Sequence, residues 1–345
     1  MGLAAANVLH RLGITVTVKE KFPRRFEQRG SSLGYVNVPL WELVRGEPMV
    51  RLGQQANRNQ GAFFYGDLWS YLYEGLPEGC VEFNSPVTDL GDDVMRPTID
   101  GKLYDAVILA DGGWSSLRHY VNGREKLPEY AGYVIYRSTL EAEYFPEFCG
   151  EGAYTVGQYF SIALDVPTCD GRKFIMGGVA VGTPESEISR PAVGGSRHAE
   201  PENAENASPP LPDWFLPFVR RTFVGRANGQ LVKWLDLCAT KGKISPLPQY
   251  EFAADRVVAG RIILMGDAAH MGSPRTAIGA HVCLLDAAAL KDVFTTYPGR
   301  DQIDQAIQAY APGGVQRARE LYECSKDVSR PIAYNPAKDD RVGRR

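Results

Sequence analysis

The sequence of 345 residues lacks a long apolar run. None approaches the roughly 18 consecutive apolar residues that cross a bilayer, so we expect no membrane span. The apolar segment Met1–Leu9 is followed by His10 and Arg11 without a small-residue cleavage site, which argues against a secretory signal peptide. Cysteine is scarce: the six residues are far apart and form no CxxC pair, which argues against a disulfide framework or a zinc site. We therefore predict reduced thiols and a cytoplasmic protein.

Other absences exclude classes of function. The net charge is −3, and the only basic run of note is the short tail Arg341–Arg345. Positive charge is therefore not concentrated in one part of the sequence. This balance argues against a nucleic-acid partner. The five histidines have no metal-ligand spacing, and the chain contains neither a Gly-x-Ser-x-Gly elbow nor a Walker loop. The apolar share of 44% is that of an ordinary globular protein, and nothing in the sequence indicates an oligomeric state.

The first third of the chain has the organisation of an α/β unit. Residues 2–12 have a helical period that ends at Gly13, and residues 14–18 are rich in β-branched side chains, as expected of a strand. Residues 22–58 are rich in Gly, Pro and Arg and predict irregular structure. A helix over 67–76 and strands over 80–84 and 104–110 follow.

The composition changes near residue 130. Alternating apolar and aromatic runs over 130–181 predict a second, antiparallel sheet, and a polar loop follows over 184–212. We expect a helix over 212–224, a strand over 230–237, and helices over 280–295 and 301–326. The predicted units are a first domain in two parts (1–130 and 257–330), an inserted substrate domain (131–256) and a tail (331–345).

A first candidate site lies at the amino terminus. In a dinucleotide-binding unit, a strand leads into a G-x-G-x-x-G turn that seats a pyrophosphate on a helix amino terminus. Gly2 and the alanines after it fit the last glycine of such a turn and its helix, whereas the strand and the first two glycines are absent. Glu20, at the end of the next strand, stands where an acid binds ribose. An ordinary βα unit with a surface glutamate is also compatible with this pattern.

A second candidate site follows the strand over 104–110. Asp111–Arg118 reads DGGWSSLR, which has the form D-G-x-x-S-x-x-R. Asp111 can accept hydrogen bonds, Gly112 lets the backbone approach a ligand closely, and Arg118 can meet a phosphate. Because Asp-Gly is also a common turn dipeptide, a simple turn with a solvated Arg118 remains open.

A third candidate site is the most informative. Arg261–His270 reads RIILMGDAAH, so a buried apolar run stops at Gly266 and Asp267. A strand that ends abruptly at an acid usually delivers the carboxylate to a ligand, and this one is placed to accept hydrogen bonds from a polyol. Ala268 and its small neighbours allow a flat ring to lie against the backbone.

The segment continues through Pro274 and Gly279 to His281. Because imidazoles act in acid-base chemistry, His270 and His281 are candidate catalytic residues together with Pro274. A structural histidine between a strand and a capped helix is the alternative for His270.

In this order and 155 residues apart, Asp111–Arg118 and Gly266–His270 resemble the two downstream fingerprints of the class A FAD-dependent aromatic monooxygenases. These enzymes share the para-hydroxybenzoate hydroxylase fold and include salicylate hydroxylase-like members. Tyr133–Arg137 and Gly279 are similar to the dihydroxypyridine hydroxylase-like branch, and the resemblance extends from Gly2 to about Leu290. It implies an α/β fold in which a Rossmann-like FAD-binding domain, lacking its first strand, carries an inserted antiparallel-sheet substrate domain.

The resemblance also implies roles. In the family, the acids that match Glu20 and Asp267 hold the adenosine ribose and the ribityl chain, and the loop that matches Pro274–Gly279 lies by the isoalloxazine. The implied activity is oxidation of NADPH or NADH with O2, through bound FAD, to hydroxylate or epoxidise a small aromatic or polyketide-like secondary metabolite. The implied cofactor-binding residues are Gly2, Glu20, Asp111, Gly112, Arg118, Gly266, Asp267, Ala268 and Gly279.

The chain departs from the family pattern at several positions. The Gly-rich turn is absent, Tyr65-Gly66 stands where members usually place an arginine, and His281 replaces a common asparagine. The interval between Glu20 and the helix near Asp67 is also short for the family. These departures leave two alternatives: a cofactor-free descendant that catalyses a cyclisation, isomerisation or hydrolysis, and an inactive remnant.

Overall fold

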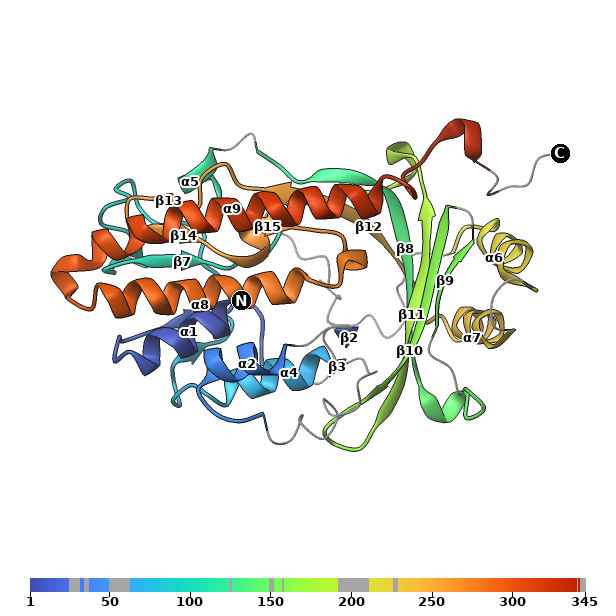
Figure 1. Ribbon diagram of the computed structural model, residues 1–345, viewed down its shortest axis with the longest axis horizontal. Coiled ribbons are helices and arrows are strands. Elements are labelled where there is room, and N and C mark those ends of the chain that lie inside the picture. Colours follow the sequence, from blue (N-terminus) through green and yellow to red (C-terminus); the bar gives the residue numbers. More distant parts are fainter. Residues whose placement is uncertain are drawn as a thin grey trace.

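The computed structural model describes residues 1–24, 32–33, 37–49, 63–123, 126–148, 152–156, 158–191, 211–225, 229–339 and 341. They form two lobes (Figure 1): helices packed around short parallel strands, and a tall antiparallel sheet with two helices on its outer face. The long helices α8 (Gly279–Thr296) and α9 (Ile303–Ser329) lie side by side along the first lobe, close to their predicted positions. Within the described ranges, no helix combines the length and apolar character needed to cross a bilayer.

The first lobe is built on short parallel strands. β7 (Val107–Leu109) pairs in parallel with β14 (Ile262–Leu264), and β13 (Val258–Ala259) pairs with the other edge of β14. A separate parallel pair joins β1 (Val18–Lys19) to β4 (Val81–Glu82). The prediction of a strand over 14–18 is therefore correct only at its last residue, where β1 begins. Within the described residues, the segment before Val18 has no partner strand, and Ile14 is exposed.

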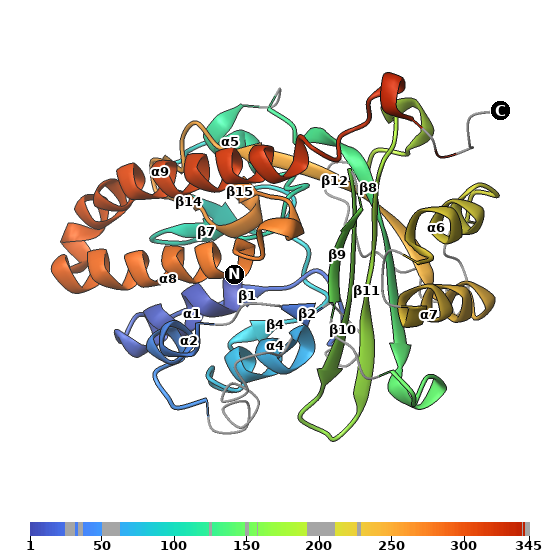
Figure 2. The ribbon, with the colours of Figure 1, turned by 45° about the vertical axis from the view of Figure 1, so that its right-hand side comes forward.

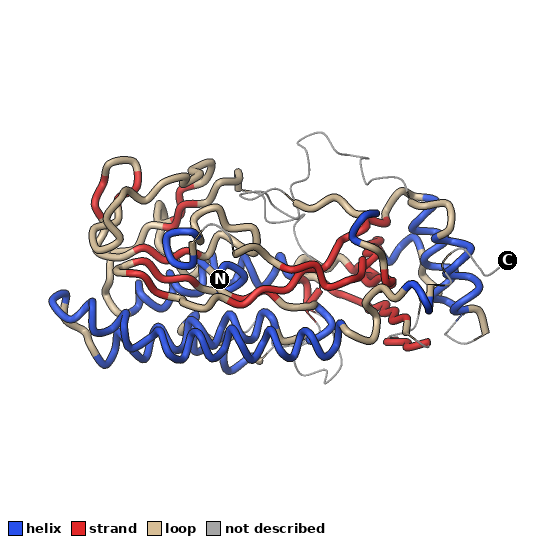
Figure 3. Tube along the Cα trace, turned by 90° about the horizontal axis from the view of Figure 1, so that it is seen from above, coloured by secondary structure: helices blue, strands red, loops and turns tan. Residues whose placement is uncertain are grey.

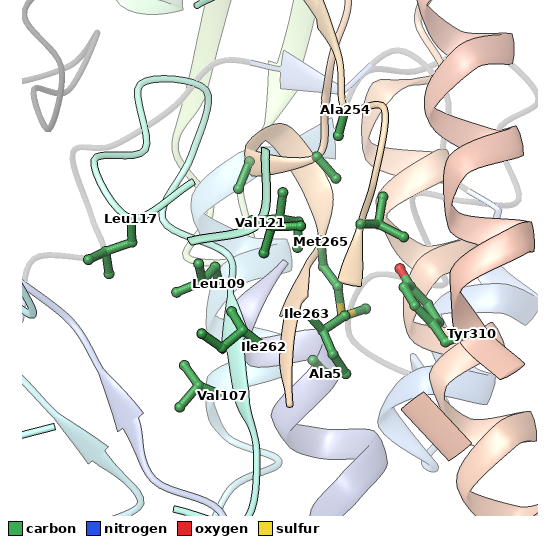
Figure 4. Packing of buried hydrophobic residues seen from close by; sticks show 14 of the residues in the cluster. Ala5, Val107, Leu109, Leu117, Val121, Ala254, Ile262, Ile263, Met265 and Tyr310 are labelled. Atoms are coloured by element: carbon green, nitrogen blue, oxygen red, sulfur yellow. The ribbon is translucent and has the colours of Figure 1, made fainter. Parts of the chain in front are cut away.

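Helix α1 (Gly2–Arg11) forms where the sequence predicts a helix, and it packs against the parallel strands. Its alanines are almost fully buried, and Gly13, with φ +78°, ends the helical segment. Figure 4 shows Ala5 packing in the same core as Leu109, Ile263 and Met265. Burial of apolar surface at about 25 cal/mol per Å² is the main force that holds this helix to the strands.

Helix α2 (Val38–Arg45) corrects the prediction of irregular structure over 22–58. Its amino terminus has ordinary start signals: the Asn37 side chain accepts a hydrogen bond from the Leu40 N–H, and Pro39 stands in the first turn. Gly46, with φ +83°, ends it. The prediction of irregular structure followed from the high Gly, Pro and Arg content of the whole segment and did not take these helix-start signals into account. Parts of 22–58 lie outside the described residues.

The second lobe is a six-stranded antiparallel sheet, as predicted, with the strand order β15-β12-β8-β11-β10-β9. β12 extends from this lobe into the first, where it pairs with β15 just beyond the Gly266–Ala268 turn, and Figure 3 shows the strands continuing from one lobe to the other. The strands are β8 (Glu129–Glu141), β9 (Gly152–Val156), β10 (Tyr159–Pro167), β11 (Lys173–Gly182), β12 (Ile244–Ala253) and β15 (His270–Met271).

Two helices cover the outer face of this sheet (Figure 2): α6 (Phe215–Phe223) and α7 (Gly229–Thr240). The prediction of a strand over 230–237 is wrong. Leu231, Trp234, Leu235 and Cys238 are buried, and this spacing of three, four and seven residues places them on one face of a helix.

The segment predicted as a tail packs against the sheet as far as it is described. Tyr334 donates its N–H to the Gly132 carbonyl at 2.7 Å, and the buried Arg341 guanidinium pairs with Glu187 and Asp339, each at 2.8 Å. The polar loop predicted over 184–212 lies mostly outside the described residues. The remaining elements are β2 (Ser32–Leu33), β3 (Phe63–Phe64), α4 (Tyr65–Tyr73), β5 (Thr98–Ile99), β6 (Lys102–Leu103) and α5 (His119–Asn122).

Candidate functional site

Asp111 and Asp267 leave neighbouring strands at the same edge of the sheet. β7 and β14 are parallel with Leu109 opposite Leu264, and each acid follows within three residues. The strand residues before them are buried or nearly so, whereas both acids are exposed. The carboxyl ends of parallel strands are where open α/β sheets bind ligands, so the two motifs converge on one place.

Arg118 links the two motifs. Its guanidinium is 3% exposed and lies over the Phe252 ring, 3.9 Å from the ring centroid. Nε donates to the Ala268 carbonyl at 2.7 Å and Nη2 to the Gly113 carbonyl at 2.8 Å. The guanidinium therefore donates to carbonyl groups of the protein itself. We assign Arg118 the role of holding the two turns in place and not that of binding a phosphate.

One buried cation, Arg118, interacts with two acids at this edge. Burial lowers the pKa of Arg118 to about 10, while the charges of Asp111 and Asp267 oppose that shift, so the guanidinium stays protonated at neutral pH. The pKa of Asp111 is raised by desolvation, offset by a hydrogen bond from Ser115 and by the charges of Arg118 and Lys21. Protein thus surrounds much of Asp111, although the residue is exposed to solvent.

The interaction of Asp111 with Lys21 brings the end of β1 to the same region. Glu20, directly after β1, is partly exposed and accepts the Phe22 N–H on Oε1 at 2.9 Å. The amino terminus of α1 is also here, because a Cβ on Gly2 would lie 3.7 Å from the Ala110 Cβ. Four segments that carry predicted site residues therefore lie close together: the start of α1 and the ends of β1, β7 and β14.

Two glycines and two helix starts at the site leave space and free N–H groups for a ligand. A Cβ added to Gly112 or to Gly279 would meet no atom within 4 Å, so both glycines border open space. Helices α1 and α8 begin without a side-chain cap and without an acid in their first turn. Uncapped amino termini carry partial positive charge and free N–H groups, which is the chemistry that binds a phosphate.

A buried ionic cluster lies beneath the Gly266 turn. The Asp286 carboxylate, on α8 and 1% exposed, accepts the Gly266 N–H at 3.1 Å, His270 Nε2 at 2.7 Å and Arg317 Nε at 2.7 Å. Burial opposes its ionisation, but the hydrogen bond from His270 and the charges of His270 and Arg317 hold its pKa below the usual value. His270, a candidate catalytic residue from the sequence, is 1% exposed and bonded to Asp286, so we assign it to positioning.

The other two catalytic candidates lie on the segment that leads into α8. Pro274 is exposed at the start of the single-turn helix η4 (Pro274–Thr276), which Ser273 caps through the Arg275 N–H. His281 is partly exposed in the first turn of α8, near Gly279. Both remain candidates for contact with a ligand.

Comparison with known proteins finds one matching domain model and several similar monooxygenases. Residues 228–323 match a model described as FAD binding domain. The chain is 26% identical to 6-hydroxynicotinate 3-monooxygenase of Bordetella bronchiseptica over 341 residues (95% of this chain, 80% of the relative), and 26% identical to salicylate hydroxylase of Pseudomonas putida over 290 residues (79% and 60%). In sequence, the chain is similar to these FAD-dependent aromatic monooxygenases.

Solved structures show the same fold. The 2,6-dihydroxypyridine-3-hydroxylase of Arthrobacter nicotinovorans superposes with a TM-score of 0.70 at 19% identity (98% of this chain, 92% of that chain). HpxO of Klebsiella pneumoniae, complexed with FAD and uric acid, superposes with a TM-score of 0.68 at 19% identity (98% and 87%). The described chain thus has the mixed α/β architecture of FAD-dependent hydroxylases.

The residues at this edge fit the chemistry of FAD, which is an elongated dinucleotide with a polyol, a diphosphate and a flat ring. The exposed Asp267 and the partly exposed Glu20 are acceptors for hydroxyl groups, and the uncapped starts of α1 and α8 suit a diphosphate. The open space at Gly112 and Gly279 suits a ring or chain lying against backbone.

Local sequence patterns do not mark every residue of this candidate site. Arg317 lies 31 residues beyond Asp286, on another helix, and no local pattern marks the pair. Phe252, which supports Arg118, resembles any other buried strand residue. The one available signal was Asp286 itself, an acid on the apolar side of a predicted helix, because a buried charge requires partners.

Replacing Arg118 by lysine is expected to weaken FAD binding about tenfold without unfolding the protein. Lysine keeps the positive charge between Asp111 and Asp267 but cannot form the fork that reaches both carbonyls, so hydrogen bonds worth about 1.5–3 kcal/mol are partly lost. Titration followed by flavin fluorescence measures the change. The exposed Arg300, replaced in the same way, is the control; equal affinity in both variants would contradict the positioning role.

Proposed function

We propose that the chain is a FAD-dependent, NAD(P)H-consuming monooxygenase that hydroxylates or epoxidises a small aromatic or secondary-metabolite substrate. One observation carries the proposal: Asp111 and Asp267 leave adjacent parallel strands and both interact with the buried Arg118. Each of the two strand ends is followed by an acid, and Arg118 links them. With the uncapped helix starts beside them, they would form a site for one elongated nucleotide.

Each part of the site would contact a different part of FAD. Asp267 would hold the ribityl chain, Glu20 the adenosine ribose, and the starts of α1 and α8 the diphosphate. Pro274 and Gly279 would lie against the isoalloxazine. When bound, FAD supplies the hydride-accepting and oxygen-activating chemistry, whereas the chain orients the ring, excludes water and supplies polar contacts.

The inner face of the sheet supports an aromatic substrate. Tyr133 on β8 contacts Ser273 of the first lobe, so alternate residues of β8 face that lobe. Ile135 shares this face with its neighbour Leu247 on β12, and both are partly exposed, as is Ile162 on β10. A partly exposed aliphatic wall between two lobes is the type of surface on which a flat aromatic ring packs.

The proposal is tested with purified protein and FAD. We expect a yellow complex and NADH or NADPH oxidation, with O2 uptake, that an aromatic substrate accelerates. The relatives and structural neighbours supply the first panel: 6-hydroxynicotinate, salicylate, 3-amino-4-hydroxybenzoate, 2,6-dihydroxypyridine and urate. A folded, colourless protein that ignores added FAD and NAD(P)H would overturn the proposal and favour the cofactor-free alternative.

Replacing Gly279 by leucine is expected to weaken FAD binding at least about tenfold, because the new side chain would fill the open space at the start of α8. The matched control is Gly229→Leu at the start of α7, where a Cβ also meets no atom within 4 Å. Both variants should fold equally well by circular dichroism. If both bind FAD like the original protein, the space at Gly279 is not part of the flavin site.

A further inference from the structure

A buried carboxylate lies where the sheet meets α9. Glu251 on β12 is 1% exposed, and its Oε1 accepts Ser325 Oγ at 2.7 Å and Ser329 Oγ at 2.6 Å, from successive turns of α9. Lys326 Nζ is 3.6 Å from Oε2 and also binds Glu129 at the surface, at 2.9 Å. Glu251 therefore joins the strand that spans both lobes to the last long helix.

The same network leads to the residue before η4. The Ser273 N–H donates to Ser325 Oγ at 2.6 Å, and Ser273 Oγ lies 2.5 Å from the Tyr133 hydroxyl. Ser273 Oγ also accepts the Arg275 N–H at 3.2 Å, and its carbonyl accepts Thr276 Oγ1 at 2.9 Å. The start of η4 is thus held from α9 on one side and from β8 on the other.

The carboxyl group of Glu251 is the common acceptor of this network. The hydroxyls of Ser325 and Ser329 both donate to its Oε1, so each serine has only its oxygen lone pairs left for further partners. Ser325 Oγ uses one of them to accept the Ser273 N–H. Ser329 also interacts with the Tyr133 hydroxyl, whose hydrogen bond with Ser273 Oγ can run in either direction. Glu251 therefore fixes the orientation of the two serine hydroxyls that lie between itself and η4.

The side chain that follows Pro274 is held by the same helix. The Arg275 guanidinium donates from Nη1 to the Val328 carbonyl of α9 and lies over the Phe160 ring of β10, 4.6 Å from the ring centroid. Both ends of the turn are therefore anchored, although Pro274 itself is exposed. An exposed residue on a turn anchored in this way has a defined place on the surface of the site.

We propose that Glu251 is a positioning residue that, through Ser325, Ser329, Tyr133 and Ser273, sets the place of the Pro274–Thr276 turn in the candidate flavin site. The role of that turn toward the flavin ring rests on the proposed function. The anchoring of the turn does not, because it is built only from contacts within the chain.

The first test uses hydrogen exchange of the full-length protein without added FAD. In Glu251→Ala, amide exchange over residues 273–278 is expected to be about tenfold faster, because local opening of the turn becomes easier. In Glu251→Gln, whose amide oxygen still accepts hydrogen bonds, exchange should stay slow. The control is Glu129→Gln, which removes an exposed carboxylate from the same Lys326 and should leave the turn unchanged.

The second test uses the FAD-loaded protein and measures the visible absorption spectrum and the reduction potential of the flavin. Glu251→Ala should shift both, whereas Glu251→Gln and Glu129→Gln should match the original protein. A merely structural defect would lower thermal stability without a spectral shift. If the original protein binds no FAD, the proposed function fails, and hydrogen exchange alone decides the positioning role.

Two outcomes would overturn the inference. One is a folded Glu251→Ala protein whose turn exchanges no faster than that of the original protein. The other is equally fast exchange in Glu251→Ala and Glu251→Gln, which would show that hydrogen bonding to this side chain is not what holds the turn. Should Glu251→Ala fail to fold, Tyr133→Phe and Ser325→Ala break the same chain one hydroxyl at a time, and unchanged exchange in both would be equally decisive.

Discussion

Replacing Asp267 by alanine is expected to weaken FAD binding by about 100-fold, because hydrogen bonds to an ionised carboxylate contribute about 1.5–3 kcal/mol each. The carboxylate is exposed at the end of β14, so its removal leaves no buried group without a partner. The fold should therefore remain intact. Equilibrium titration with FAD, followed by flavin fluorescence, measures the loss.

Asp292→Ala, which removes an exposed acid farther along α8, is the matched control and should bind FAD like the original protein. Asp267→Asn should fall between the two, since an amide oxygen still accepts hydrogen bonds. Unchanged affinity in Asp267→Ala would show that FAD is bound elsewhere or through other groups, and it would remove the main support for the proposed function.

Asp286→Ala is expected to lower the free energy of unfolding by about 3–5 kcal/mol, the usual cost of leaving buried charges without their partner. Arg317 would lose its ion pair, His270 its hydrogen bond, and the Gly266 N–H its acceptor. Urea unfolding of the FAD-free protein measures the loss. An effect below about 1 kcal/mol, as in an ordinary surface substitution, would contradict the assigned role of the cluster.

The same comparison has a pH dependence with a definite sign. The pKa of Asp286 is lowered in the folded protein, so the carboxylate stabilises the fold above its unfolded-state pKa of about 3.9. This contribution is lost as the pH falls through the folded-state pKa. Below about pH 5, the difference between the original protein and Asp286→Ala should shrink as the pH falls through the folded-state pKa of Asp286. A difference that grows on acidification below about pH 4 would refute this assignment.

The sequence predicts the parts of this fold that local patterns determine. The apolar runs that end at Asp111 and Asp267 are short buried strands, and their order along the chain is characteristic enough to indicate the family. The alternating runs after residue 130 form the antiparallel sheet, because a side-chain period of two is the property of a strand with two different faces.

What the sequence does not predict depends on contacts between distant residues. Nothing near Arg118 indicates that its guanidinium turns inward to carbonyls on another strand, and nothing near Glu251 indicates two serines on α9. The strand predicted over 230–237 shows a different failure. Its β-branched and aromatic residues fit a strand, and only the buried set centred on Trp234 shows that the helical period governs.

The pairing of β7 with β14 joins Leu109 to Leu264, on either side of the whole second lobe. During synthesis, β7 therefore leaves the ribosome long before β14 is made. Its apolar side chains remain without their partner strand while about 150 further residues are added. In the antiparallel sheet, the pairs β9–β10 and β10–β11 join consecutive strands and are expected to form earlier. The pairing of β12 with β8 forms only after residue 244, and it brings β14 close to β7. The first lobe is thus the part of this protein most exposed to aggregation in the nascent chain.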